Sequence, residues 1–371
     1  MRIAYGVHGY GRGHAVRSLT VLTELARRHD LLVLCGGGGG DALPILARFG
    51  AVEIPGLTFG YRGARLSAMR TVRENARMLA SLLLGAGPVA EVERLLTAFR
   101  AEVVISDSEP LVLRAAGRLG IPRIGFDHVG VIAWCRPEAS PKDALELGRD
   151  RLLYRLLLGS PEHVIVSSFF FAPPRRRDVT VVPPVLRERV LEAKVRDDGH
   201  LLVYFNQPQL FTADVLSALR DVGVPSVVYG ARREGVEGPV RFAPIDEAAF
   251  VEDLASARAV LATSGHQLAS EALHLGKPML LCPEQSAEQR LNARELVRLG
   301  AARMADPRRF TAKVLQEFLE GLDAHRRALA RLPRDGNALA LSTLEGHFRG
   351  LAARAAARTR APRRILAGFR P

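Results

Sequence analysis

Short apolar runs alternate with longer segments of helical periodicity along the whole chain. In the first half, apolar runs that predict β-strands lie near residues 2–7, 31–35, 51–54, 102–106, 122–126 and 163–166. The segments between them carry apolar residues spaced three and four apart, which is typical of amphipathic helices. Strands that alternate with helices usually pair into a parallel sheet covered on both faces. The pattern therefore predicts an α/β fold with a doubly wound sheet in the first half of the chain.

A second series of strands begins with HLLVYF at 200–205. It follows a basic, proline-rich stretch at 173–190, PPRRRDVTVVPPVLRERV, which interrupts the periodicity. The chain has 371 residues, more than one hydrophobic core usually organises, and 48% of them are apolar. We therefore expect two domains, over 1–175 and 196–335, joined by a linker over 176–195.

The end of the chain predicts one more helix and a charged tail. Leu341, Leu344, Phe348 and Leu351 keep helical spacing, and we expect this last helix, within 336–371, to cross back onto the first domain. Residues 351–371 carry six of the thirteen net positive charges and no acid, which is typical of a solvated end. Five consecutive glycines at 36–40 predict a flexible loop.

Residues 262–293 read ATSGHQLASEALHLGKPMLLCPEQSAEQRLNA and predict a strand, a tight turn, a helix from 266 and another strand. A strand that passes into a helix through small residues leaves backbone N–H groups unpaired, with the positive end of the helix dipole behind them. A diphosphate fits there. The candidate groups are those of Ser264, Gly265, His266 and Gln267.

Polar side chains that suit a sugar nucleotide follow this turn. Glu271 lies one and a half turns into the helix, and its carboxylate can accept two hydrogen bonds from paired hydroxyls such as those of a ribose. Gln289 and Asn292, three apart, share one face of the next helix, where they could bind sugar hydroxyls. Each residue alone is compatible with an ordinary turn or surface position, so the inference rests on their spacing.

That spacing resembles the C-terminal halves of GT-B glycosyltransferases, in particular UDP-glycosyltransferases and the family 28 N-acetylglucosaminyl transferase of lipid II synthesis. The matching residues are Gly265, Glu271, Gly276, Pro278, Pro283, Glu288, Gln289, Asn292 and Ala293. The resemblance implies two Rossmann-like domains that face each other across a cleft, with the second domain binding the nucleotide sugar. The chain departs from the plant-type pattern at Thr263, Gln267 and Leu268, and Leu268 has no hydroxyl for a phosphate. Phosphate binding would then rest on the backbone amides of 264–267, the Ser264 hydroxyl or His266.

The first strand passes into a second glycine-rich loop, HGYGRGH, ahead of an amphipathic helix. Glycines at 9, 11 and 13 do not fit the G-x-G-x-x-G fingerprint, and the next strand ends in Gly36 instead of an acid, which argues against a nicotinamide dehydrogenase. The ending Gly11-Arg12-Gly13-His14 resembles the Gly-Gly-His loop of the lipid II enzyme. GxGHxxR also resembles the first loop of a nucleotide-sugar hydrolase. We expect Gly11, Arg12 and Gly13 to line an acceptor or phosphate loop.

Three strand ends in the first half carry candidate acid-base residues. His14 could take a proton from an acceptor hydroxyl, because an imidazole has an unperturbed pKa of about 6.5, or it could only orient a phosphate or cap the helix. His8 is the competing choice. Asp107 corresponds to the acid that orients the histidine in many UDP-glycosyltransferases, although a turn-forming or capping role fits equally. Asp127 and His128 form a reserve pair.

Two further positions in the second half are donor-site candidates. Asn206 directly follows the strand at 200–205, and loops after parallel strands line the crevice, although a simple turn is equally compatible. Phe242 opens a stretch, FAPI, that resembles the place where family members hold the nucleotide base, and it could equally be core. Asp107-Ser-Glu109 spells a D-x-E, but the two-lobed pattern argues against a metal, and we expect no metal and no cofactor.

The chain is strongly basic, with a pI near 10.5, yet zinc spacings and recognition-helix motifs are absent and aromatic residues make up only 6%. This argues against a nucleic-acid partner. A positive field would suit a diphosphate donor and an anionic membrane surface. Segments at 61–85 and 149–159 mix arginine with leucine and could touch lipid, although core-facing helices explain them as well.

The sequence also limits location and thiol chemistry. It has no apolar run of about 20 residues, and it begins with a strand instead of a signal peptide. We expect a cytoplasmic protein, with peripheral contact to the inner face of the membrane as an option. Cys35, Cys135 and Cys282 lie far apart, so neither a disulfide framework nor a zinc site is expected.

The resemblance implies an inverting glycosyltransferase that moves a sugar from a UDP or dTDP sugar to a hydroxyl of a small-molecule or lipid-linked acceptor. A nucleotide-sugar hydrolase or epimerase on the same fold is the alternative. A binding protein without turnover is a third interpretation. The residues leave the acceptor, the sugar and the oligomeric state open.

Overall fold

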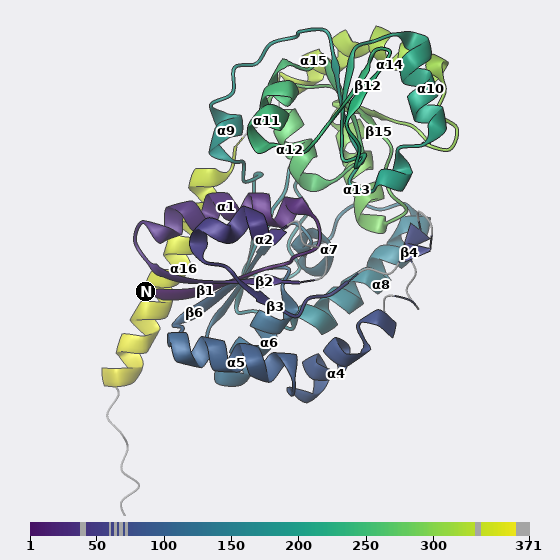
Figure 1. Ribbon diagram of the computed structural model, residues 1–371. Helices are drawn as coiled ribbons and strands as arrows, with labels where there is room; N and C mark the ends of the chain where they lie inside the picture. Colours follow the sequence, from purple (N-terminus) through teal and green to yellow (C-terminus); the bar gives the residue numbers. More distant parts are fainter. Residues whose placement is uncertain are drawn as a thin grey trace, which may run out of the picture.

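The computed structural model describes residues 1–37, 42–58, 61–62, 65–66, 70, 73–330 and 335–360. Two seven-stranded sheets, each with helices on both faces, form a lower and an upper unit in Figure 1. The expected α/β class with two doubly wound sheets is therefore confirmed. Most of the glycine run at 36–40 and the end of the basic tail lie outside the described residues.

The first sheet contains only parallel strand pairs. In order across the sheet, its strands are β3 (Val52–Ile54), β2 (Asp30–Gly36), β1 (Arg2–Val7), β6 (Val103–Asp107), β7 (Arg123–Asp127), β8 (His163–Ser167) and β9 (Val179–Val182). All six strands expected in the first half are present. Every residue of β6 is buried, as expected for a parallel strand between two helical layers.

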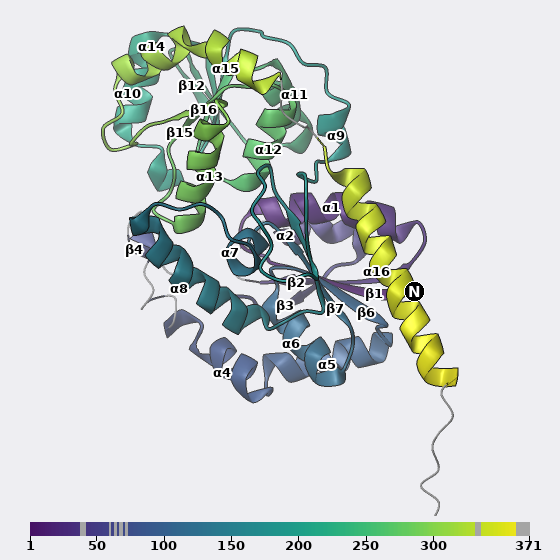
Figure 2. The same cartoon turned by 180° about the vertical axis from the view of Figure 1, so that it is seen from behind.

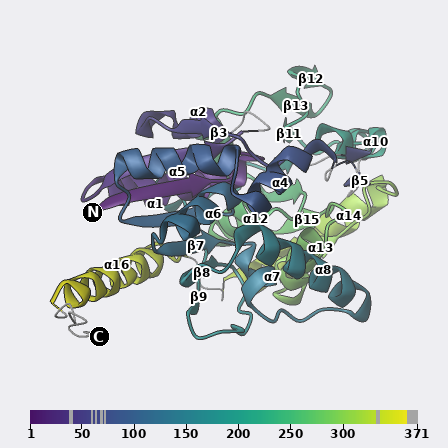
Figure 3. The ribbon, with the colours of Figure 1, turned by 90° about the horizontal axis from the view of Figure 1, so that it is seen from below.

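Helices cover both faces of this sheet (Figures 1 and 3). The helices of the first unit are α1 (Arg12–Ala26), α2 (Ala42–Leu46), α4 (Ala76–Leu84), α5 (Pro88–Phe99), α6 (Pro110–Leu119), α7 (Gly130–Trp134) and α8 (Pro141–Leu158), with a 3-10 turn at Ala47–Phe49. One buried cluster joins the sheet to α1 and α2, and another joins the opposite face to α4, α5 and α6. A small antiparallel pair, β4 (Tyr61–Arg62) and β5 (Arg65–Leu66), stands apart from the sheet.

The second sheet repeats the same order of winding. Across the sheet its strands are β12 (Gly235–Glu237), β13 (Val240–Ala243), β11 (Ser226–Tyr229), β10 (Leu201–Tyr204), β14 (Ala259–Ala262), β15 (Met279–Leu281) and β16 (Ala302–Met304). Only β12 runs antiparallel to its neighbour. The helices are α10 (Ala213–Val222), α11 (Glu247–Ser256), α12 (His266–His274), α13 (Ala287–Arg298), α14 (Ala312–Glu320) and α15 (Leu322–Leu329), with a 3-10 turn at Pro208–Leu210.

The connection between the units differs from the sequence expectation. Strand β9 lies within the range expected to be linker, where it adds a seventh strand beside β8. The strand, VTVV, was not predicted because it is short and lies among basic and proline residues that interrupt the periodicity. The chain then passes through the short helix α9 (Glu188–Leu191) into the second unit, which Figure 2 shows from behind.

The last helix, α16 (Asn337–Arg360), leaves the second unit and packs on the first (Figure 2). Ala340, Leu344 and Phe348 are buried in the same cluster as β1 and α1. The helical spacing in the sequence identified this buried face, since residues three and four apart lie on one side of a helix. The chain thus crosses between the units twice.

Direct contacts also join the two units. Arg290 and Arg294 of α13 pair with Asp143 of α8, at 2.9 Å for Arg290 Nε and 3.5 Å for the Arg294 terminal nitrogen. Ala287 and Leu291 of the same helix pack into an apolar cluster of the first unit. The carboxyl ends of the two sheets are thereby held close to each other.

None of the helices in the described part of the chain is long and apolar enough to span a bilayer. Cys35, Cys135 and Cys282 are free thiols, and all three are buried.

Candidate active site

Each sheet reverses its winding at one point, and the predicted site residues gather at these two points. The first sheet reverses between β1 and β6, where the His8 backbone N–H donates to the Asp107 carbonyl at 3.0 Å. The second reverses between β10 and β14, where the Thr263 hydroxyl donates to Asn206 Oδ1 at 3.3 Å. Ligands of such sheets bind outside the strand ends at the reversal.

The two reversal points meet at the boundary between the units. Gln207, after β10, donates to the Tyr10 hydroxyl at 2.6 Å. A Cβ placed on Gly13 would lie 3.5 Å from Cβ of Gln267, so the first turns of α1 and α12 approach closely. One composite site therefore lies between the units.

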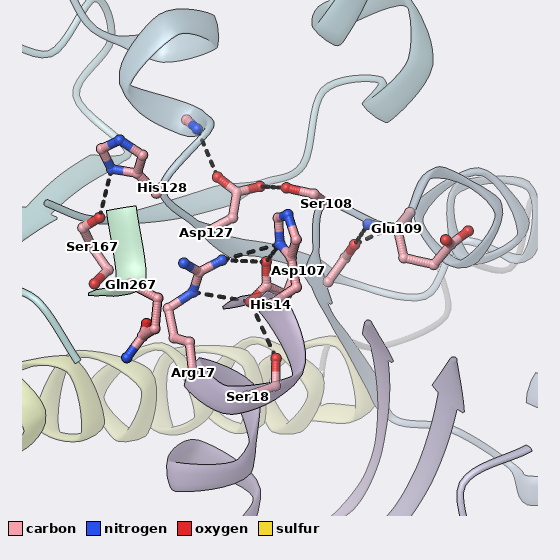
Figure 4. A network of polar contacts seen from close by, with 12 residues as sticks. His14, Arg17, Ser18, Asp107, Ser108, Glu109, Asp127, His128, Ser167 and Gln267 are labelled. Carbon is pink, nitrogen blue, oxygen red and sulfur yellow. Dashed lines mark hydrogen bonds and ion pairs between the residues drawn. The ribbon is translucent and has the colours of Figure 1, made fainter. Parts of the chain in front are cut away.

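Asp107 is the centre of a buried polar network in this site (Figure 4). Its Oδ1 lies 2.7 Å from His14 Nδ1, and Arg17 donates to both carboxylate oxygens at 2.5 and 3.0 Å. The Ser18 hydroxyl adds a bond of 3.1 Å. Burial disfavours the charged form of the fully buried Asp107, but Arg17 and His14 outweigh it, so the pKa of this carboxyl lies below its ordinary value.

His14 lies in the first turn of α1 and is the more exposed of the two candidate histidines. Its side chain is 22% exposed, whereas His8 is only 6% exposed. The Asp107 carboxylate can only accept, so His14 Nδ1 carries the proton and Nε2 presents its lone pair. The His8 ring meets His14 edge to face at 5.2 Å, and burial, helped by His14, lowers the pKa of His8 to about 3.

The reserve pair is occupied by structural contacts. Asp127 accepts from the Gly130 amide at 2.6 Å and from the Ser108 hydroxyl at 2.9 Å. Burial and then the charge of Asp107 raise the pKa of Asp127. His128 bonds Ser167 O at 3.1 Å through Nδ1, and burial lowers its pKa to about 4. Neither residue offers a group to the site as His14 does.

The N-termini of α1 and α12 have no side-chain cap. Gly11 and Gly265 occupy their N-cap positions without a capping side chain, and neither first turn contains an acid. A Cβ on Gly11 or Gly265 would meet no described atom within 4 Å, so both starts are open among the described residues. Because each helix start carries unpaired N–H groups and a positive partial charge, an anion between them would satisfy both. Arg12, also predicted here, begins α1 and is half-buried.

The other predicted donor-site residues of this loop bond to one another. Ser264 is fully buried, and its hydroxyl and amide donate to Gln289 O at 2.7 Å and Gln289 Oε1 at 3.2 Å. Asn292, also fully buried, donates to Ser264 O at 3.1 Å and faces His128 Nε2 through Oδ1 at 2.9 Å. The expected roles of the Ser264 hydroxyl toward phosphate and of Gln289 and Asn292 toward sugar hydroxyls stay predictions, and a ligand would have to share these groups with their partners in the protein. Buried polar groups must pair, and these have paired internally.

His266 and Gln267 complete the boundary contact. The His266 ring stacks on His128 at 3.7 Å between centroids, and burial, then His128, lowers its pKa well below the ordinary value. His266 Nδ1 and Gln267 Oε1 are buried polar atoms that have no hydrogen-bond partner among the described residues. These two side-chain atoms at the start of α12 could therefore form hydrogen bonds with a ligand.

Glu271 has a partner that the sequence did not indicate. Arg187 donates to Oε1 at 2.9 Å and to Oε2 at 2.7 Å, and Gln267 adds a bond of 3.0 Å to Oε1. The carboxylate is only 1% exposed. The expected open carboxylate is therefore not observed, and a pentose would have to share these oxygens with Arg187, which enters from the expected linker.

The remaining candidate residues differ in how far they are exposed to solvent. Glu288 lies in the first turn of α13, and burial raises its pKa. Asn206 is exposed at the crevice. The Phe242 side chain is 3% exposed and is covered by the Arg233 guanidinium at 3.7 Å, so a nucleotide base could contact only its backbone. Within the described ranges, no three or more His, Cys, Asp or Glu residues are grouped to hold a metal ion.

The sequence analysis assigned no individual role to two arginines of the site, although Arg17 ends the GxGHxxR pattern. Arg17 was detectable, because it stands three residues after His14 and therefore on the same helix face. Arg187 had no such signal, since its partner lies 84 residues away.

The chain matches a known protein family over most of its length. The model of a family described as glycosyl transferase family 1 matches residues 1–323. A search of curated protein sequences finds no match.

Solved structures match along nearly the whole chain. Phytolacca americana UGT2, complexed with UDP-2fluoro-glucose and pterostilbene, has a TM-score of 0.65 at 13% identity, covering 95% of this chain and 99% of its own. The glycosyltransferase VinC in complex with dTDP has a TM-score of 0.60 at 15% identity, covering 95% and 100%. MurG of Acinetobacter baumannii has a TM-score of 0.59 at 14% identity, covering 93% and 99%. At these identities, the likeness shows a shared GT-B fold.

Proposed function

The chain belongs to glycosyl transferase family 1, and we propose that it transfers a sugar from a UDP or dTDP sugar to an acceptor hydroxyl with inversion at the anomeric carbon. The proposal rests on one observation: the uncapped N-termini of α1 and α12 approach each other beside the His14–Asp107 contact. This arrangement offers an anion site and a proton acceptor within one crevice.

The diphosphate of the donor is proposed to lie between the two helix starts. Its negative charge would interact with the N–H groups of residues 265–267 and with the positive ends of both helices. His266 Nδ1 can donate a further hydrogen bond to the diphosphate, whereas Gln267 Oε1 can accept one from a hydroxyl of the donor. Donors that are already oriented where charge develops contribute strongly to catalysis.

In the proposed reaction, His14 Nε2 accepts the proton of the acceptor hydroxyl. The acceptor oxygen forms a bond to the anomeric carbon as the bond from that carbon to the diphosphate oxygen breaks. The electron pair of this bond leaves with the nucleoside diphosphate, whose charge the helix starts stabilise. Asp107 accepts the Nδ1 hydrogen bond and holds the imidazole in the required tautomer.

Two of the matching structures support the choice of nucleotide. One is described with UDP-2fluoro-glucose and another with dTDP. We propose that Asn206 and the backbone after β13 lie along the nucleoside, with Glu271 sharing its oxygens between Arg187 and the pentose hydroxyls.

The acceptor is proposed to be a small molecule or a lipid-linked molecule that binds over the first unit. Helix α8 supports a lipid-facing option, because Leu145, Leu152 and Leu156 are 81%, 62% and 58% exposed. Arg149 and Arg155 lie among them and suit an anionic surface. A cytoplasmic enzyme in peripheral contact with the inner leaflet would sediment with anionic vesicles and remain free of zwitterionic ones.

A donor screen followed by kinetics tests the function. A binding sugar nucleotide at about 100 times its Kd should add about 2.7 kcal/mol to the stability and raise the Tm. With an accepted donor and acceptor, His14→Gln should lower kcat by about 10² to 10⁴ and leave the donor Kd within about twofold. The matched variant His8→Asn should retain most of the activity.

Two outcomes would contradict this assignment. If His8→Asn loses turnover and His14→Gln does not, the base is His8. If free sugar is released stoichiometrically without acceptor, the protein is a hydrolase. The glycosyltransferase identity of the matching structures does not favour that alternative.

A further inference from the structure

Asp107 contacts two cationic or potentially cationic groups, and the stronger contact is with Arg17. This guanidinium is 3% exposed and grips both carboxylate oxygens, and one of its terminal nitrogens also lies 3.2 Å from His14 Nδ1 (Figure 4). A carboxylate that faces an imidazole alone favours the imidazolium form. Here the carboxylate is already paired with a full positive charge.

The other groups around His14 belong to neighbouring elements. His8 follows β1, and Glu288 begins α13. His266 begins α12, and His128 follows β7. All three of these neighbouring histidines have pKa values lowered by burial, so they remain neutral near pH 7.

Two acids remain besides Asp107. Burial raises the pKa values of both Glu288 and Asp127, so the charge of each is disfavoured. Arg17 and Asp107 are therefore the dominant opposing charges beside the His14 ring.

We propose that Arg17 is a positioning residue that cancels the charge of Asp107, so that Asp107 orients His14 without stabilising its imidazolium form. The two hydrogen bonds from Arg17 fix the plane of the Asp107 carboxylate, and Oδ1 is thereby directed at His14 Nδ1. The value of this arrangement to catalysis rests on the proposed glycosyl transfer, but the charge cancellation itself does not.

The test is the titration of His14 by ¹⁵N NMR of the whole chain, with His14→Gln used to assign its signal. Arg17→Gln removes the charge but keeps a hydrogen-bond donor for Asp107. Its His14 midpoint should rise by about one pH unit, since a single unneutralised charge at this distance typically shifts a titration by about one to three units. Arg17→Lys, which keeps the charge, should titrate like the wild type.

The double variant Arg17→Gln with Asp107→Asn removes both charges. Because it leaves no unpaired buried ion, it provides the test even if Arg17→Gln alone does not fold. If the charges cancel, its His14 midpoint should lie within about half a pH unit of the wild type. A drop of one unit or more in the double variant, or an unchanged midpoint in a folded Arg17→Gln, would overturn the proposal.

Kinetics separate this proposal from the proposed function. In an active enzyme, Arg17→Gln should move the acid limb of the kcat profile upward, with kcat about tenfold lower at pH 6 and little changed at pH 9. A loss of equal size at all pH values would assign Arg17 a merely structural role. If no donor and acceptor support turnover, the function fails while the NMR titration still decides the charge cancellation.

Discussion

At the residue scale, the interior of this protein contains ion pairs that link distant parts of the chain. Arg187 and Glu271 are 84 residues apart and form a bidentate pair that is almost fully buried. A buried ion whose partner is removed keeps its desolvation cost without compensation. The pair therefore anchors the connection between the units to the helix that begins the proposed donor site.

Removal of one partner should be costly. Arg187→Ala should lower the free energy of unfolding by about 3 to 5 kcal/mol, because it leaves the Glu271 charge buried and unpaired. Chemical denaturation measures this loss. The matched control Arg189→Ala changes an exposed arginine of α9 and should stay within about 0.5 kcal/mol of the wild type.

The double variant Arg187→Ala with Glu271→Ala should recover part of the loss, since no unpaired charge remains. A double variant that is less stable by the sum of the two single effects would show that the pair does not act as a unit.

At the scale of elements, the described helices differ in how their starts are capped. Side chains cap the starts of six of the described helices: α6, α8, α10, α11, α13 and α14. Helices α1, α4, α7 and α12 have neither a capping side chain nor an acid in the first turn. At α1 and α12, where an anion is proposed to bind, the helix starts therefore lack the stabilisation that a side-chain cap would give.

A cap at α12 should separate stability from binding. Gly265 has φ −63° and ψ 134°, which any residue adopts, and its Cβ position is open. Gly265→Asp should therefore raise the free energy of unfolding by about 0.5 to 2 kcal/mol through the new cap. It should also weaken nucleotide-sugar binding at least tenfold, because its charge would repel the diphosphate.

Calorimetry and denaturation of the same sample measure both effects. Gly265→Ala is the control, since it adds a Cβ without a cap or a charge. Unchanged donor affinity in Gly265→Asp would place the diphosphate elsewhere.

At the scale of the whole molecule, neutral histidines join the two units. His128 of the first unit stacks on His266 of the second and bonds Asn292 of α13. Burial lowers the pKa values of both rings, to about 4 for His128. Since an unfolded histidine has a pKa of about 6.5, the unfolded chain binds more protons than the native one between about pH 4 and 6.5.

Stability should therefore fall as pH decreases from 6.5 toward 4. Each histidine that is protonated only in the unfolded chain contributes a loss of about 1.4 kcal/mol per pH unit. His128→Gln should reduce this slope by up to one such contribution, as measured by denaturation at several pH values. An unchanged slope in His128→Gln would contradict the assignment of neutral rings to this contact.

The local elements and their class follow from the order of residues alone. The six strands of the first half, the turn into α12 and the buried face of α16 follow from periodicity and turn chemistry, which depend on residues close in the chain. For the same reason, the spacing of three between His14 and Arg17 is sufficient to place both on one helix face.

The pairing of polar groups, in contrast, is a property of the folded chain. Ser264 and Asn292 bond within the loop and to His128, and Glu271 bonds Arg187, because burial forces each polar group to take the nearest partner that folding brings to it. Strand β9 likewise formed where an open sheet edge met a short apolar run. The spacing of residues encodes which side chains share a face, whereas their partners depend on which strand ends become neighbours.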